Sequence, residues 1–161
     1  MSIIKVFSRI NESVVDSFIK AEKELKEEKV FHIFINSYGG NYGDFGRVSS
    51  VIFNIAQKRV LISGEAIRAE SASMLLFLNC SERIVSKKSI GVIHLPEPKM
   101  FVSEEIYEKT RLEALNFIKR RTHLSKDTVI SLNKIELTSE EMCKLHIATK
   151  KVDYFKWAEP Y

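Results

Sequence analysis

The chain has 161 residues, of which 45% are hydrophobic, so it is long enough to bury the core of a single domain spanning residues 1–161. The net charge of +4 is modest and basic residues alternate with acidic ones, which argues against a nucleic-acid-binding function. No apolar run reaches the roughly 18 to 20 residues that cross a bilayer, and the N-terminus lacks a signal-peptide pattern, so we expect a cytoplasmic protein that does not bind membranes.

The first half of the chain alternates predicted strands with predicted helices. The strands are short runs rich in β-formers, and the helices carry apolar residues at helical spacing. The expected order is a strand at 2–7, a helix after Asn11, a strand at 30–35, a helix from Tyr42 or Asp44, and a strand at 59–63. This alternation predicts an α/β fold with a largely parallel sheet.

The second half begins with an apolar helix after two serines. Pro96 and Pro98 exclude regular structure just beyond His94, and Thr138 with Glu141 fits a capping box. The remaining expected elements are strands at 82–85 and 90–93, helices at 103–121, 125–132 and 138–145, and a closing strand at 152–155.

The two serines, Ser71 and Ser73, stand where a predicted helix begins. A serine at a strand-to-helix turn exposes its hydroxyl above the sheet, beside N–H groups that have no partner in the helix. Such a serine can act as a nucleophile when a base lies near, and His94, at the end of a predicted strand, is the candidate base. The same serines also fit the simpler role of helix caps.

Gly39 and Gly40 directly follow the buried strand at 30–35. Paired glycines let the main chain of a ligand approach closely, although they fit an ordinary turn equally well. Ligands of parallel sheets gather at the carboxyl ends of the strands. Because the glycine pair, Ser73 and His94 all follow such ends closely, the pattern favours one common site.

Cys80 and Cys143 are the only cysteines. Two cysteines at this spacing match neither a disulfide framework nor a zinc site, so we expect buried, reduced thiols. The sequence indicates no metal site and no cofactor.

Four ordered motifs resemble the Clp protease proteolytic subunit (ClpP) family. The resemblance extends from about residue 3 to residue 153, which is nearly the whole chain. The motifs are residues 35–40 (Ile-Asn-Ser-Tyr-Gly-Gly), 64–66 leading to 72–74 (Gly-Glu-Ala and Ala-Ser-Met), 92–96 (Val-Ile-His-Leu-Pro) and 137–141 (Leu-Thr-Ser-Glu-Glu).

The resemblance implies a ClpP/crotonase-like fold of repeated ββα units, with a long helix after the histidine, and serine-type endopeptidase chemistry. By position in the Ala-Ser-Met motif, Ser73 matches the family nucleophile, Ser71 falls outside that register, and His94 matches the general base. The family's oxyanion hole then corresponds to the backbone N–H groups of Gly39 or Gly40 and of Met74.

The chain departs from the family pattern where the third catalytic residue belongs. The family usually has an aspartate just before the Leu-Thr motif, whereas residues 131–136 contain none. Asn133 is our candidate for orienting the histidine, as in Cys-His-Asn proteases, and Glu136 is the next candidate. Asn133 equally fits a turn residue.

Other departures from the family pattern concern the channel for the peptide and the assembly of subunits into rings. Tyr38 replaces a usual proline and Leu75 a usual glycine, and both add bulk beside the site. Residues 96–99 replace a longer Gly-rich segment that joins two rings in the family. The chain also begins at its first strand, without the family's axial loops, so an ATPase unfoldase partner is in question.

The resulting hypothesis is a cytoplasmic ClpP-like hydrolase that cleaves peptides or unfolded protein and forms a homo-oligomeric ring. The missing aspartate leaves open a catalytically inactive structural or regulatory subunit. A crotonase-type enzyme acting on a coenzyme A thioester is a third alternative, because that superfamily uses similar paired N–H groups.

Overall fold

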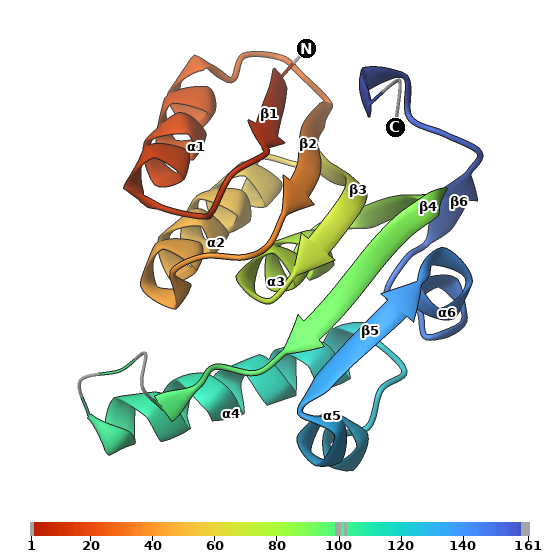
Figure 1. Cartoon of the computed structure of the whole chain (residues 1–161). Helices are drawn as coiled ribbons and strands as arrows, with labels where there is room; N and C mark the ends of the chain where they lie inside the picture. The colour runs from red at the N-terminus through yellow and green to blue at the C-terminus, as the bar shows by residue number, and fades with distance from the viewer. Residues whose placement is uncertain (1, 99–100, 102, 159–161) are drawn as a thin grey trace.

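The computed structural model describes residues 2–98, 101 and 103–158, and for Leu132 the backbone alone. The elements follow one another as helices and strands that alternate through the first half of the chain (Figure 1). They are β1 (Ser2–Val6), α1 (Glu12–Glu24), β2 (Val30–Ser37), α2 (Tyr42–Gln57), β3 (Leu61–Glu70), α3 (Ala72–Leu78), β4 (Glu82–His94), α4 (Glu104–Arg121), α5 (Lys126–Leu132), β5 (Lys134–Thr138), α6 (Ser139–Lys144), β6 (Lys150–Val152) and the 3₁₀ helix η2 (Lys156–Ala158).

The described strands form one sheet of six strands in the order β1-β2-β3-β4-β5, with β6 beside β4. All described pairings are parallel except that of β4 with β5. The fold is therefore the α/β class with a largely parallel sheet that the sequence predicts, and α4 is the long helix expected after His94.

Helices α1, α2 and α3 cover one face of the sheet (Figure 1). The alternation of β2 explains this, since Phe31, Ile33 and Ile35 point into the core while the residues between them lie on the other face. On that other face Trp157 of η2 stacks on Phe34 with ring centroids 4.8 Å apart. All seven residues of α3 are buried, so this short helix lies at the centre of the molecule.

Strand β4 corrects the prediction of two separate strands at 82–85 and 90–93. Its register with β3 shifts between Ala66 and Arg68, where residues 86–89 of β4 lie opposite the single residue 67 of β3. The Ser89 hydroxyl donates to the Ala66 carbonyl at 2.6 Å and so takes the place of a ladder hydrogen bond. Two further strands differ from expectation, because β5 was not predicted and β6 lies at 150–152 instead of 152–155.

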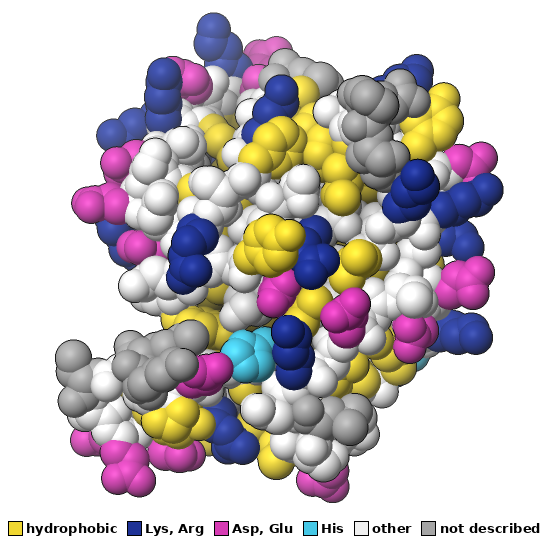
Figure 2. Space-filling view, viewed as in Figure 1, with side chains coloured by type: hydrophobic (Ala, Val, Ile, Leu, Met, Phe, Trp, Pro, Cys, Tyr) yellow, Lys and Arg dark blue, Asp and Glu magenta, His cyan; other side chains and the backbone are white. Residues whose placement is uncertain are grey.

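Charged side chains of both signs are interspersed over the face shown in Figure 2. None of the helices in the described part of the chain is long and apolar enough to cross a membrane.

Candidate active site

The carboxyl ends of β2, β3 and β4 meet at one edge of the sheet, as neighbouring parallel strands must. The glycine pair follows β2, Ser71 follows β3, and His94 ends β4. The Ser71 N–H donates to the Val92 carbonyl at 3.0 Å, which ties the turn after β3 to the last residues of β4. The fold thus brings together the segments that the sequence selects.

Ser73, the predicted nucleophile, lies inside the core. Its side chain is completely buried, and its hydroxyl donates to the Ser37 Oγ at 2.7 Å. The Ser37 hydroxyl donates in turn to the Ser8 carbonyl at 2.7 Å. A hydroxyl enclosed in this way has no path to a peptide carbonyl, so the geometry argues against Ser73 as the nucleophile.

Ser71 occupies the strand-to-helix turn itself. Its backbone has φ 57° and ψ −122°, a conformation that costs strain for any residue other than glycine. The side chain is partly exposed, and it makes no capping hydrogen bond to α3, so the role of a helix cap is absent at this serine. A strained turn that projects a serine hydroxyl from the sheet edge is the arrangement that nucleophilic serines adopt on α/β sheets.

The sequence favours Ser73 by its register in the Ala-Ser-Met motif, and it does not show where the turn lies. The predicted strand ends at residue 63, whereas β3 continues to Glu70. The turn therefore falls at Ser71, and Ser73 is already in the first turn of α3.

Gly39 and Gly40 form the loop on the other side of the turn. Gly39 has φ 116°, and a Cβ there would lie 3.0 Å from both the Glu70 carbonyl oxygen and the Ser71 Cβ. At Gly40 a Cβ would lie 2.4 Å from the backbone N and O atoms of Ile10. Only glycine at both positions allows the loop to touch Ser71 and Ile10 together.

The backbone N–H groups beside Ser71 differ in their availability. The Gly39 N–H donates to the Ser37 hydroxyl at 3.3 Å. The Gly39 carbonyl and the Asn41 N–H both bond to Ile10, so the N–H of Gly40 between them points away from Ile10. Of the glycine pair, Gly40 is therefore the available donor.

The sequence predicts that the Met74 N–H is the second donor of the oxyanion hole, but in the structure this N–H is already bonded. It donates to the Ser71 carbonyl at 3.0 Å within the first turn of α3. The N–H of Ala72 precedes that turn and has no partner within the helix. It also lies 3.5 Å from the position of a Cβ on Gly39, so it adjoins the glycine loop.

His94 lies at the end of β4 with its side chain 23% exposed. Its Nε2 is 3.4 Å from Oε1 of Glu97, and its backbone carbonyl accepts a hydrogen bond from the Tyr42 hydroxyl at 3.1 Å. Within the described part of the chain, neither serine hydroxyl is hydrogen-bonded to the His94 imidazole.

The two residues predicted to orient the histidine are exposed. Asn133 ends α5 with φ 57°, and no described hydrogen bond joins its side chain to His94. The antiparallel register sets Lys134 opposite His94 and Glu136 opposite Val92. The carboxylate that does contact the imidazole is Glu97, which sequence reasoning missed although it stands only three residues after His94.

Tyr42 lies between Ser71 and His94. Its hydroxyl is 3.1 Å from the Ser71 Oγ as well as 3.1 Å from the His94 carbonyl oxygen. Burial raises the pKa of Tyr42, the hydrogen bond to Ser71 partly offsets this rise, and the nearby Glu97 adds to it. The phenol is therefore protonated at neutral pH.

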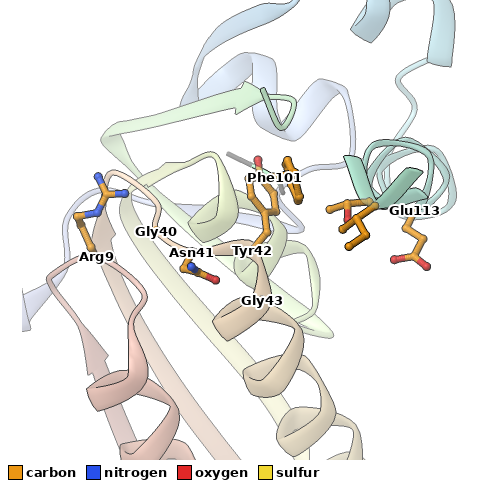
Figure 3. Close-up of a pocket in the computed structure, with 9 residues that line it drawn as sticks. Arg9, Gly40, Asn41, Tyr42, Gly43, Phe101 and Glu113 are labelled. Atoms are coloured by element: carbon orange, nitrogen blue, oxygen red, sulfur yellow. The ribbon is translucent and has the colours of Figure 1, made fainter. Parts of the chain in front are cut away.

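A groove between α2 and α4 leads to this tyrosine. One pocket of about 510 Å³ is lined by residues 40–43 at the start of α2, Phe101 and Ile106 (Figure 3). A second pocket of about 350 Å³ continues along the same helices past Phe45 and Phe117. Tyr42 lines both pockets, and its hydroxyl contacts Ser71, so this side chain connects the groove to the serine.

The two bulky departures from the family pattern differ in their exposure and in their neighbours. Tyr38 is 67% exposed, and the Arg68 guanidinium lies 4.6 Å from the centre of its ring. Leu75 is buried and lines the second pocket of the groove. The described residues contain no group of three or more side chains placed to hold a metal ion.

Comparison with known proteins supports the fold. No protein-family model matches the sequence, and no curated protein matches it. Among solved structures, a ClpP1 variant from Listeria monocytogenes superposes with a TM-score of 0.80 at 16% identity, over 94% of this chain and 91% of that chain. A peptidase from Plasmodium falciparum superposes with a TM-score of 0.76 at 15% identity, over 94% of this chain and 96% of that one.

These similarities define the fold: the chain has a ClpP-like fold. The resemblance seen in the sequence is therefore confirmed at the level of the fold.

Proposed function

We propose that the protein is a ClpP-like serine peptidase whose nucleophile is Ser71. The observation that supports this best is the strained turn at Ser71, which lies against the glycine loop and is tied to the end of β4 that carries His94. In this proposal His94 is the general base, and the N–H groups of Gly40 and Ala72 form the oxyanion hole.

The reaction follows the serine peptidase scheme. His94 takes the proton of the Ser71 hydroxyl as Oγ attacks the carbonyl carbon of the peptide bond, and the N–H groups hold the oxyanion. His94 then gives that proton to the amine nitrogen, the C–N bond breaks, and the acyl group remains on Ser71. Water, deprotonated by His94, hydrolyses this ester and restores the serine.

We assign to Glu97, and not to Asn133, the role of stabilising the imidazolium form of His94. The proton transfer creates a positive charge on His94, and a carboxylate 3.4 Å away stabilises that charge. The amide of Asn133 carries no charge and shares no described hydrogen bond with the histidine.

The groove between α2 and α4 suits a peptide substrate. Its first pocket is lined by Tyr42 together with Phe101 and Ile106, so it favours an apolar substrate side chain. We further propose that the substrate is a peptide or unfolded protein, that the protein works in the cytoplasm as a homo-oligomeric ring, and that an ATPase unfoldase is a possible partner. Native mass spectrometry tests the ring.

Labelling with a fluorophosphonate tests the nucleophile. We expect the wild-type protein and Ser73→Ala to be labelled and to cleave a fluorogenic peptide, whereas Ser71→Ala loses both properties. Ser73→Ala is the matched control, because it removes the same hydroxyl two residues away. The opposite pattern, with labelling lost only in Ser73→Ala, restores the assignment that the sequence favours.

A second candidate function is a non-catalytic subunit with the same fold. It is favoured by one observation, namely that the Ser71 hydroxyl contacts Tyr42 and not the His94 imidazole. Absence of fluorophosphonate labelling and of peptide cleavage in every oligomeric state of the wild-type protein would support this alternative.

A further inference from the structure

Tyr42 is placed to control the serine. It is the first residue of α2, where Asn41 caps the helix, and its hydroxyl reaches both the turn after β3 and the end of β4. Tyr42→Phe removes both contacts, whereas Ser71→Ala removes only the contact with the serine.

The number of protons fixes the direction of the two hydrogen bonds. A backbone carbonyl only accepts, so the single proton of the Tyr42 hydroxyl is donated to the His94 carbonyl oxygen. The contact between Tyr42 and Ser71 then needs the proton of Ser71. In this structure the serine hydroxyl therefore donates to Tyr42.

Attack on a peptide requires the opposite arrangement, because the serine must donate its proton to the imidazole. A hydroxyl has one proton, so the bond to Tyr42 and the bond to His94 exclude each other. We propose that Tyr42 is a latch that holds the Ser71 hydroxyl in a resting state, and that a substrate side chain bound in the groove between α2 and α4 releases it. This proposal rests on the proposed function, in which Ser71 is the nucleophile.

The position of the Tyr42 ring links the groove to the Ser71 hydroxyl. Tyr42 lines both pockets of the groove, so a side chain bound there contacts the ring whose hydroxyl holds the serine. A shift of the phenol away from Ser71 leaves the serine proton free to turn toward His94. Groove occupation and serine activation are thereby coupled through one side chain.

The test compares rates of fluorophosphonate labelling in the full-length protein. Tyr42→Phe keeps the ring and removes the competing acceptor, so the second-order rate constant should rise about threefold to tenfold, as expected for loss of one hydrogen bond. Tyr42→Leu should change the rate in the same direction. Tyr154→Phe removes the hydroxyl of an exposed tyrosine that lines neither pocket and should leave the rate unchanged.

A rate for Tyr42→Phe that equals or falls below the wild-type rate overturns the latch while leaving Ser71 as nucleophile. If neither the wild-type protein nor Tyr42→Phe is labelled, the proposed function fails and the latch fails with it. Circular dichroism melting checks that each variant is folded.

A titration tests the hydrogen bond without reference to activity. A serine hydroxyl that donates to Tyr42 stabilises the phenolate, so Ser71→Ala should move the tyrosine titration of Tyr42 to higher pH. Tyrosine labelled with ¹³C at Cζ reports this by NMR, with Tyr42→Phe giving the assignment. An unchanged Tyr42 titration in Ser71→Ala shows that the serine proton does not face Tyr42 and overturns the latch.

Discussion

The hydroxyls of Ser73 and Ser37 are hydrogen-bonded at 2.7 Å within the core, where α3 packs against the end of β2. This bond joins two residues that are 36 positions apart in the sequence. The Ser37 hydroxyl also donates to the Ser8 carbonyl, so the hydrogen bonds extend to the loop after β1. Ser73 therefore stabilises the frame of the site without reaching its surface.

We expect Ser73→Ala to lower the free energy of unfolding by about 0.5 to 1.5 kcal/mol, the usual contribution of a buried neutral hydrogen bond. Urea denaturation measures this change. Ser131→Ala is the control, because that exposed serine bonds only within its own helix and its replacement should have little effect. Equal stability losses in the two variants would contradict the structural role of Ser73.

The glycine loop gives a second prediction. A Cβ on Gly40 would lie 2.4 Å from the Ile10 backbone, and backbone atoms cannot move aside as a flexible side chain does. Gly40→Ala should therefore cost roughly 2 kcal/mol or more in unfolding free energy. The rate at which fluorophosphonate labels the Gly40→Ala variant should also fall, because the loop that carries the oxyanion donor is displaced.

Gly46→Ala is the matched control for this loop. Gly46 lies within α2, and a Cβ there meets nothing within 4 Å. Alanine in a helix interior is more favourable than glycine, so the variant should be as stable as the wild type or more stable by up to about 1 kcal/mol. A Gly40→Ala protein that is as stable as Gly46→Ala would show that the loop tolerates a side chain.

Element types were predictable from the sequence wherever the pattern is local. Apolar residues at helical spacing and capping side chains gave α1, α2, α4 and α5 nearly at their observed bounds, and the capping box at Thr138 is present in α6. Strand β5 was missed because its five residues form an exposed, short strand. Its pairing with β4 stabilises it, and that contact is invisible to a local pattern.

The site was predictable to the level of segments but not of single residues. Which serine lies at the turn depends on how far β3 extends beside β4, and this is a property of the sheet. The burial of Ser73 likewise depends on Ser37 across the core. The Ala-Ser-Met motif is too short to resolve two serines that are two residues apart.

Substitution of Glu97 tests which side chain stabilises the charged imidazole of His94. Glu97→Gln keeps the shape of the side chain and removes the charge that faces the imidazolium, so peptide cleavage should fall about threefold to tenfold. Measurement of kcat with a fluorogenic peptide decides this. Asn133→Ala and Glu136→Gln serve as controls and should retain wild-type kcat. A large loss in either control, with little loss in Glu97→Gln, would return the orienting role to the residue that the sequence indicated.

The burial of Cys80 predicts how the free energy of unfolding depends on pH. The thiol is fully buried between α3 and β4, and burial raises the pKa of Cys80 to about 12, although Arg83 and Arg121 act in the opposite direction. In the unfolded chain the thiol ionises at its ordinary pKa near 8.5. Because the folded state holds the proton more tightly, the stabilisation is complete below that ordinary pKa and is lost as the pH rises toward 12.

We therefore expect the unfolding free energy to decline between about pH 9 and pH 12, and to decline less in Cys80→Ala, which has no thiol to ionise on unfolding. Urea denaturation at a series of pH values measures both slopes. Alkylation by iodoacetamide at pH 8 should modify the partly exposed Cys143 and spare Cys80 in the native protein, while both react after unfolding. Equal slopes for the two proteins, or rapid native alkylation of Cys80, would show that the thiol ionises in the folded state.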